Sequence, residues 1–128
     1  MAVTLNVTDV DLGVGLIYVF GTAALSGTYP SGGDTVDWTS IRTQLGYDGQ
    51  SVASSMANPA FGPVQAAFTV QGGTPNIYNL QQGSAPNAWK LRAYTSGSSG
   101  AEFTGGSAYP SSATGDTITF SAVFRKLT

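Results

Sequence analysis

Cysteine and histidine are both absent from this chain of 128 residues. Without them the protein has no disulfide, no thiolate nucleophile, none of the usual zinc sites and no catalytic triad with imidazole as its base. Charged residues are also scarce, at 9% of the chain against about a quarter in an average globular protein, and the formal net charge is -2. Nucleic-acid binding needs clustered Lys and Arg side chains, and the chain has no such cluster. We therefore expect neither a nucleic-acid partner nor a cofactor.

Long hydrophobic runs are missing as well. The longest, residues 14–20, is interrupted by Gly15 and is too short to span a membrane. Residues 1–6 contain neither the basic nor the apolar region of a secretory signal. We expect that the protein is synthesised in a cytoplasm and does not associate with a membrane.

Hydrophobic residues make up 41% of the chain. Because charged residues are few, the polar part of the surface must consist mainly of Ser, Thr, Gly, Asn and Gln. Its length corresponds to one domain, residues 1–128, with an ordinary core. A surface with few charges lacks the mutual repulsion that keeps proteins apart. Such a surface suits lasting contact with another protein.

Short alternating segments, separated by Gly and Pro, indicate β-strands throughout. Residues 16–20 are apolar at every position, which predicts a central strand covered on both faces, and Gly21 suggests a bulge or a close backbone neighbour. Residues 9–13 read as a turn, whose DVDLG spacing matches only the opening of a calcium loop. The expected fold class is all-β, an antiparallel β-sandwich or a jelly-roll-like barrel. The remaining expected strands are residues 3–7, 64–70, 77–80, 89–94 and 118–124.

One pattern occurs twice. Residues 27–39 (GTYPSGGDTVDWT) are echoed by residues 106–121 (GSAYPSSATGDTITFS), each with Tyr-Pro-Ser followed by Gly-Asp-Thr. Either two hairpins use the same favoured turn chemistry, which we prefer, or a duplicated unit forms two pseudo-symmetric halves. In both cases we expect buried strand positions in equivalent hairpins, at Val36, Trp38, Ile118 and Phe120.

Candidate chemistry is sparse. Asp34 and Asp116 follow turn glycines, where Asp commonly hydrogen-bonds its own backbone, so we do not expect them to act as a catalytic carboxylate pair. We expect no enzyme activity and no metal site. An aromatic platform for sugars remains an alternative, although such residues more often belong to the core. Its candidate members are Trp38, Trp89, Tyr18, Tyr78, Tyr94 and Tyr109.

Two blocks carry a resemblance to a known family. Residues 25–37 (LSGTYPSGGDTVD), together with residues 89–94 (WKLRAY) and 102–109 (EFTGGSAY), resemble head decoration, or cement, proteins of tailed bacteriophages. The resemblance covers about half of the chain. It implies a β-domain added to the outside of the capsid, which bridges neighbouring capsomers. The strand pattern begins at Val3, so a long N-terminal arm, which some decoration proteins have, is not expected here.

The implied partner is the major capsid protein, and the implied location is the exterior of the virion. We expect a homotrimer, at least in the bound state, whose contact surface combines the two Tyr-Pro turns with residues 51–63. The interface candidates are Tyr29, Pro30, Met56, Pro59, Phe61, Tyr109 and Pro110. The alternative is a phage tail or fibre module that binds glycans through exposed aromatic side chains.

Overall fold

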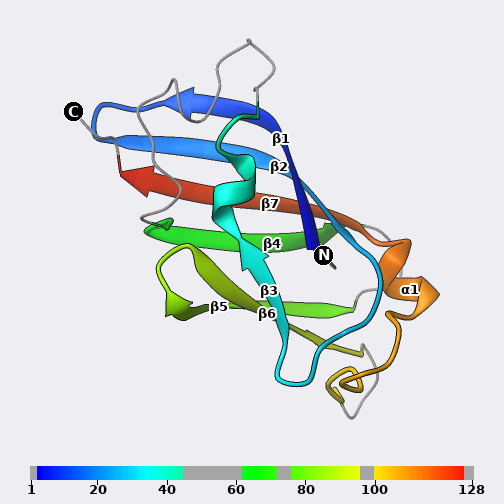
Figure 1. The fold of residues 1–128 in the computed structure, drawn as a ribbon. Helices are drawn as coiled ribbons and strands as arrows, with labels where there is room; N and C mark the ends of the chain where they lie inside the picture. Colours follow the sequence, from blue (N-terminus) through cyan, green and yellow to red (C-terminus); the bar gives the residue numbers. More distant parts are fainter. Residues whose placement is uncertain (1–2, 45–61, 72–75, 96–99, 126–128) are drawn as a thin grey trace.

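The chain folds as two antiparallel β-sheets, which confirms the expected all-β class (Figure 1). The computed structural model describes residues 3–44, 62–71, 76–95 and 100–125. One sheet has four strands in the order β1-β2-β7-β4, and the other has three in the order β3-β6-β5. The strands of the first sheet are β1 (Val3–Leu12), β2 (Leu16–Leu25), β7 (Thr117–Arg125) and β4 (Gln65–Gln71). Those of the second are β3 (Asp34–Asp37), β6 (Ala88–Tyr94) and β5 (Ile77–Ala85).

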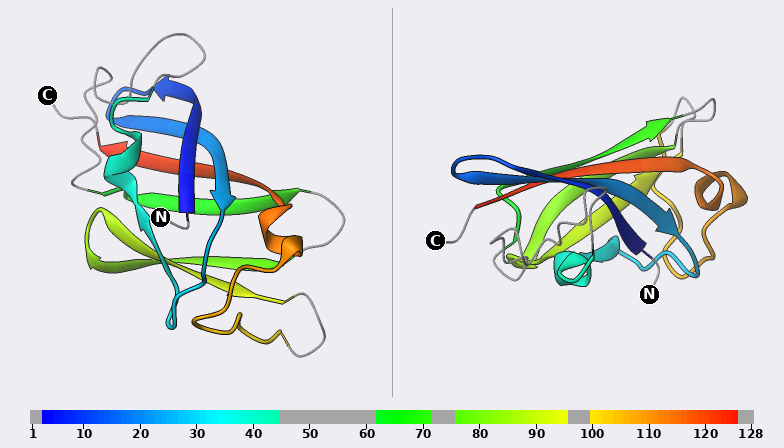
Figure 2. Two further views of the ribbon diagram at one scale, coloured as in Figure 1. Left: turned by 45° about the vertical axis from the view of Figure 1, so that its right-hand side comes forward. Right: turned by 90° about the horizontal axis from the view of Figure 1, so that it is seen from above.

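The hydrophobic core lies between the two sheets (Figure 2). Its largest fully buried side chain, Trp38, packs edge-on against the rings of Trp89, Phe120 and Phe124, with centroids 5.8–6.2 Å apart. Inward and outward residues alternate along β6 and β7, as their sequence predicts. Both sheets therefore share one core.

Strand β2 corrects one expectation. It is central in its sheet, because it pairs with β1 on one side and β7 on the other. Its burial nevertheless alternates, and the side chains of Tyr18 and Phe20 are exposed on the outer face. An antiparallel sheet in a sandwich packs on one face only, so an all-apolar run does not require two-sided cover.

Strand β1 corrects another. Residues 9–12 are not a turn but continue the strand, after a register shift between Val7 and Asp9. The expected close approach at Gly21 is confirmed, since a Cβ there would collide with the Asn6 carbonyl oxygen and with the Phe120 ring. The register shift in β1 is a β-bulge that reverses the alternation of inward and outward side chains. Val7 and Val10 therefore both face inward, while Asp9 and Asp11 face solvent.

Two short helical turns interrupt the β-structure. The 3₁₀-helix η1 (Trp38–Ile41) follows β3 directly, and Asp37 caps it by accepting hydrogen bonds from the Thr39 backbone N–H and hydroxyl. The hydrogen bond from the Thr39 hydroxyl lowers the pKa of Asp37, and weaker bonds from the Thr39 backbone N–H and the Asn87 side chain lower it further. Helix α1 (Ser111–Thr114) is a single turn that leads into β7.

The repeated pattern does not form two equivalent hairpins, so that expectation is wrong. The first copy enters β3, an edge strand of the three-stranded sheet, whereas the second enters β7, between β2 and β4. Trp38 begins a 3₁₀-helix rather than occupying a strand. The burial expected of Val36, Trp38, Ile118 and Phe120 is confirmed.

Candidate functional site

The two Tyr-Pro segments meet side by side, although about 80 positions of sequence separate them. Thr28 and Ala108 form an antiparallel bridge. The backbone N–H of Tyr29 donates to the Ser107 carbonyl (2.9 Å), and that of Tyr109 donates to the Gly27 carbonyl (3.0 Å). These two bonds are equivalent under a local twofold axis through the bridge. We call residues 27–30 and 107–110 the Tyr-Pro corner.

The tyrosine rings of the corner point into the protein. Tyr29 is 1% exposed and Tyr109 is 6% exposed. Their rings make an edge-to-face contact with centroids 5.6 Å apart, and the ring of Phe103 packs against both. Three aromatic rings thus fix the two chain segments relative to each other.

The two buried hydroxyl groups each donate to a carboxylate. Tyr109 Oη donates to Asp34 Oδ2 (2.7 Å), so the tyrosine of the second copy binds the aspartate of the first. Tyr29 Oη donates to Glu102 Oε2 (2.7 Å) and accepts from the backbone N–H of Ala93 (3.2 Å). Burial, reinforced by the bond to Glu102, raises the pKa of Tyr29 to about 12. Burial and the bond to Asp34 raise the pKa of Tyr109 as well.

A third tyrosine repeats the arrangement beyond the corner. Tyr78 Oη donates to Asp116 Oδ2 (2.6 Å), the same oxygen that accepts from Asn76 Nδ2 (3.1 Å). Burial, followed by the bond to Asp116, raises the pKa of Tyr78. The phenol groups therefore stay protonated at neutral pH and act as fixed donors. This arrangement anchors loops and strand ends.

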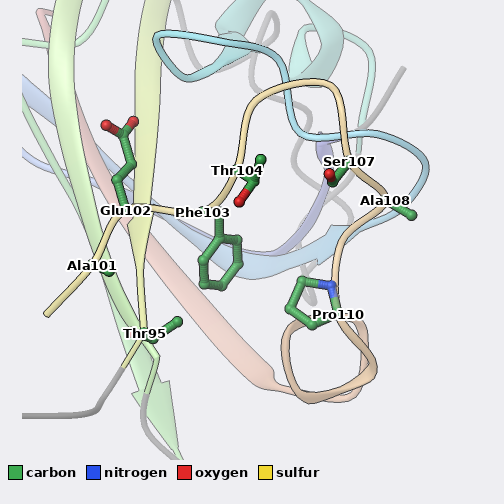
Figure 3. Close-up of a pocket in the computed structure, with 8 residues that line it drawn as sticks. All are labelled: Thr95, Ala101, Glu102, Phe103, Thr104, Ser107, Ala108 and Pro110. Atoms are coloured by element: carbon green, nitrogen blue, oxygen red, sulfur yellow. The ribbon is translucent and has the colours of Figure 1, made fainter. Parts of the chain in front are cut away.

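A pocket of about 320 Å³ opens beside the corner (Figure 3). The buried ring of Phe103 lies amid the lining residues, and Pro110 closes one side. Of the lining side chains only Glu102 is charged, and it is already bound to Tyr29 and lies 3.7 Å from Arg92 Nη1. The pocket is lined by Thr95, Ala101, Glu102, Phe103, Thr104, Ser107, Ala108 and Pro110.

The interface candidates fall into three groups. Pro30 and Pro110 are exposed, and Pro110 borders the pocket. Tyr29 and Tyr109 are buried, so their rings support the corner from inside instead of touching a partner. Met56, Pro59 and Phe61 lie outside the described residues. The use of this surface as an interface stays a prediction, which rests on the prolines and the pocket rim.

Sequence reasoning missed the partners of the repeated pattern's acids. Asp34 does accept from the adjacent Thr35 backbone N–H (2.9 Å), as expected, but its second oxygen binds Tyr109. Asp116 instead binds Tyr78 and Asn76. The two aspartates therefore serve different tyrosines and do not share one cleft. The recurrence of Tyr and Asp in both copies was the available signal for the bond between Tyr109 and Asp34.

The aromatic platform is not assembled. Trp38, Trp89 and Tyr109 are buried, and Tyr78 and Tyr94 are half-buried. Tyr18 is exposed, on the outer face of the four-stranded sheet. A flat row of exposed rings for sugar stacking is therefore not formed by these six residues.

Comparison with family models, curated proteins and solved structures finds no match. Within residues 3–44, 62–71, 76–95 and 100–125, no three acidic, His or Cys side chains are grouped so that they would hold a metal ion. The same residues contain no helix with the length and apolar character needed to cross a membrane.

Proposed function

We propose that this protein is a structural component of a tailed-bacteriophage virion, which decorates the exterior of the capsid and stabilises it by bridging neighbouring capsomers. The observation that carries the proposal is the Tyr-Pro corner with its pocket. Exposed prolines and small uncharged side chains stand there on a base fixed by buried Tyr–carboxylate bonds. The resemblance to decoration proteins rests largely on this same stretch of sequence.

The chemistry of the corner suits a lasting protein contact. Charged residues are depleted in the centres of interfaces, where each buried charge needs a partner. The corner offers an apolar pocket floor and a rim of hydroxyl and methyl groups, and its one carboxylate is already engaged. A partner side chain entering the pocket would not have to desolvate an unpaired charge.

Rigidity adds to this suitability. The backbone bonds across the corner and the three packed rings hold the exposed surface in one conformation before binding. A pre-organised surface loses little conformational entropy on association. Copies that bridge capsomers, as homotrimers, would bind the assembled shell more tightly than its isolated subunits, because their contacts act together.

The test is co-sedimentation of the purified protein with expanded phage heads. Ala108→Asp and Thr104→Asp place a charge on the pocket rim and should each weaken binding at least tenfold, since an unpaired charge would be buried. Ser84→Asp, on the exposed end of β5, is the matched control and should bind like the parent. If both rim variants bind normally, the corner is not the contact surface.

Salt provides a second criterion. Contacts made by uncharged groups are little affected by ionic strength, which screens exposed ion pairs. Binding to heads should therefore persist from low to molar salt. Retention on glycans without affinity for heads would instead support the alternative of a tail or fibre module.

A further inference from the structure

The outer face of the four-stranded sheet carries two exposed aromatic side chains next to two aspartates. Tyr18 is 37% exposed and Phe20 is 41% exposed, both on β2 and two residues apart. The β1–β2 register places Asp11 directly opposite Tyr18 and Asp9 directly opposite Phe20. Side chains opposite each other in an antiparallel pair share a face, with Cβ atoms about 5 Å apart. We call these four residues the aromatic–acid face.

The β1 bulge creates this face. Before the bulge, Val3 and Leu5 face the core, and unbroken alternation would have turned Asp9 and Asp11 inward as well. The shift between Val7 and Asp9 brings Val10 into the core and both carboxylates into solvent. The register shift in β1 therefore places two carboxylates beside two aromatic rings on the solvent-facing side of the sheet.

The remaining described acids are already used inside the protein. Asp34, Asp116 and Glu102 accept hydrogen bonds from tyrosines, and Asp37 caps η1. In contrast, the hydrogen bond that Asp9 accepts within the described residues comes from the neighbouring Thr8 hydroxyl (3.4 Å). Within the described ranges, the ion pair found is Arg92 with Glu102, not one involving Asp9 or Asp11. Arg125 lies opposite Leu16 in the β2–β7 register, at the end of this face.

We propose that the aromatic–acid face binds an extended segment of a partner protein with Lys or Arg at alternate positions. A cation over a Tyr or Phe ring is attracted to the ring's negative face, and a carboxylate beside the ring adds charge complementarity. The two ring–acid pairs repeat every two residues, about 6.8 Å along a strand, which is also the repeat of same-side residues in an extended peptide. Each of two alternate cations would meet one ring and one carboxylate.

This surface is separate from the Tyr-Pro corner. Tyr18 and Phe20 lie in the first half of β2, whereas the corner begins after its last residue, Leu25. The contact chemistry also differs, because binding here should weaken with salt while binding through the corner should not. The inference therefore stands or falls independently of the proposed function.

The probe is a labelled ten-residue peptide of alternating Lys and Thr, measured by fluorescence anisotropy and by amide chemical shifts. We expect saturable binding, with the shifts centred on residues 9–11 and 18–20. Asp9→Asn with Asp11→Asn should weaken it roughly five- to tenfold, in line with two exposed ion pairs. Tyr18→Ser with Phe20→Ser should weaken it by a similar factor through loss of the cation–ring contact. Ile77→Ser, an exposed apolar residue of the other sheet, is the control and should have no effect.

A charge-reversal variant provides the most specific test of the proposed binding. Asp9→Lys with Asp11→Lys should abolish binding of the Lys peptide and confer binding of a matched Glu-Thr peptide. Thermal unfolding followed by circular dichroism establishes that each variant is folded. The proposal is overturned if the Lys-acetylated peptide binds as well as the charged one, if the Lys peptide does not bind, or if neutral oligosaccharides bind the face more tightly than the peptide.

Discussion

Three tyrosine hydroxyl groups connect distant parts of this chain at the residue scale. Tyr29, Tyr78 and Tyr109 bind carboxylates that lie 73, 38 and 75 positions away, respectively. Each bond gives a tyrosine hydroxyl an acceptor, and the bond from Tyr109 also satisfies a carboxylate oxygen of the buried Asp34. The repeated pattern contains Tyr29, Asp34, Tyr109 and Asp116 but does not indicate which of them pair, because both copies offer the same groups. The other two partners, Tyr78 and Glu102, lie outside both copies.

Tyr109→Phe removes the donor of the most deeply buried of these bonds. Asp34 is itself buried, so its Oδ2 would lose a partner, and we expect a loss of about 1–3 kcal/mol in unfolding free energy. Urea denaturation measures the change. Tyr18→Phe removes an exposed hydroxyl and should cost less than about 0.5 kcal/mol. Equal stability of the two variants would show that the Tyr109–Asp34 bond contributes nothing.

Alkaline pH should destabilise the fold through the same groups. The pKa of Tyr29 rises from 10.0 to about 12 on folding, so the folded state favours the protonated phenol. This contribution is fully present below pH 10 and is lost as the pH rises through about 12, since the unfolded chain releases its proton first. Urea midpoints between pH 8 and pH 12 should fall more steeply for the parent than for Tyr29→Phe. Parallel curves would contradict the assignment.

At the scale of the element, strand β1 has an open edge that one side chain covers. Gln44 Oε1 accepts from the Val7 backbone N–H (2.6 Å), and Gln44 Nε2 donates to the Leu5 carbonyl (2.8 Å). A side-chain amide offers the same donor and acceptor as a peptide group, so Gln44 occupies the edge as a short strand would. Exposed edges invite pairing with other chains, and covering them limits aggregation.

Gln44→Leu should therefore uncover the edge. We expect a loss of roughly 1–2 kcal/mol in unfolding free energy from two hydrogen bonds, together with increased self-association in light scattering. Thr43→Ala, at the exposed neighbouring position, should leave both measurements unchanged. If the Gln44 variant remains as stable and as monodisperse as the Thr43 variant, the edge is protected in another way.

The strands themselves were largely predictable, and their irregularities were not. Alternation identified β6 and β7 and their buried residues, because a half-buried strand imposes a two-residue period. The Asp-x-Asp-x-Gly spacing of residues 9–13 indicates a turn, whereas the strand continues to Leu12 through a bulge that has no distinct local signature. The alternation rule also extended the strand pattern through Trp38, where the Asp37 cap favours a helical turn.

At the scale of the molecule, composition and fold class agree. A chain poor in charge and rich in β-branched and aromatic residues forms a two-sheet sandwich with one core. The contact between the two Tyr-Pro copies was beyond sequence reasoning, because it joins a loop after β2 to the segment before α1. Resemblance suggested that these turns matter, and the structure gives them a physical role in building a rigid surface.

Thermal release of DNA from filled phage heads, with and without the added protein, tests the proposed shell-stabilising role most directly. A ligand that binds the assembled shell but not its released subunits stabilises the shell by mass action. We predict that saturating protein raises the temperature of DNA release, and that Ala108→Asp loses this effect while Ser84→Asp retains it. The same release temperature with and without saturating protein would contradict the account.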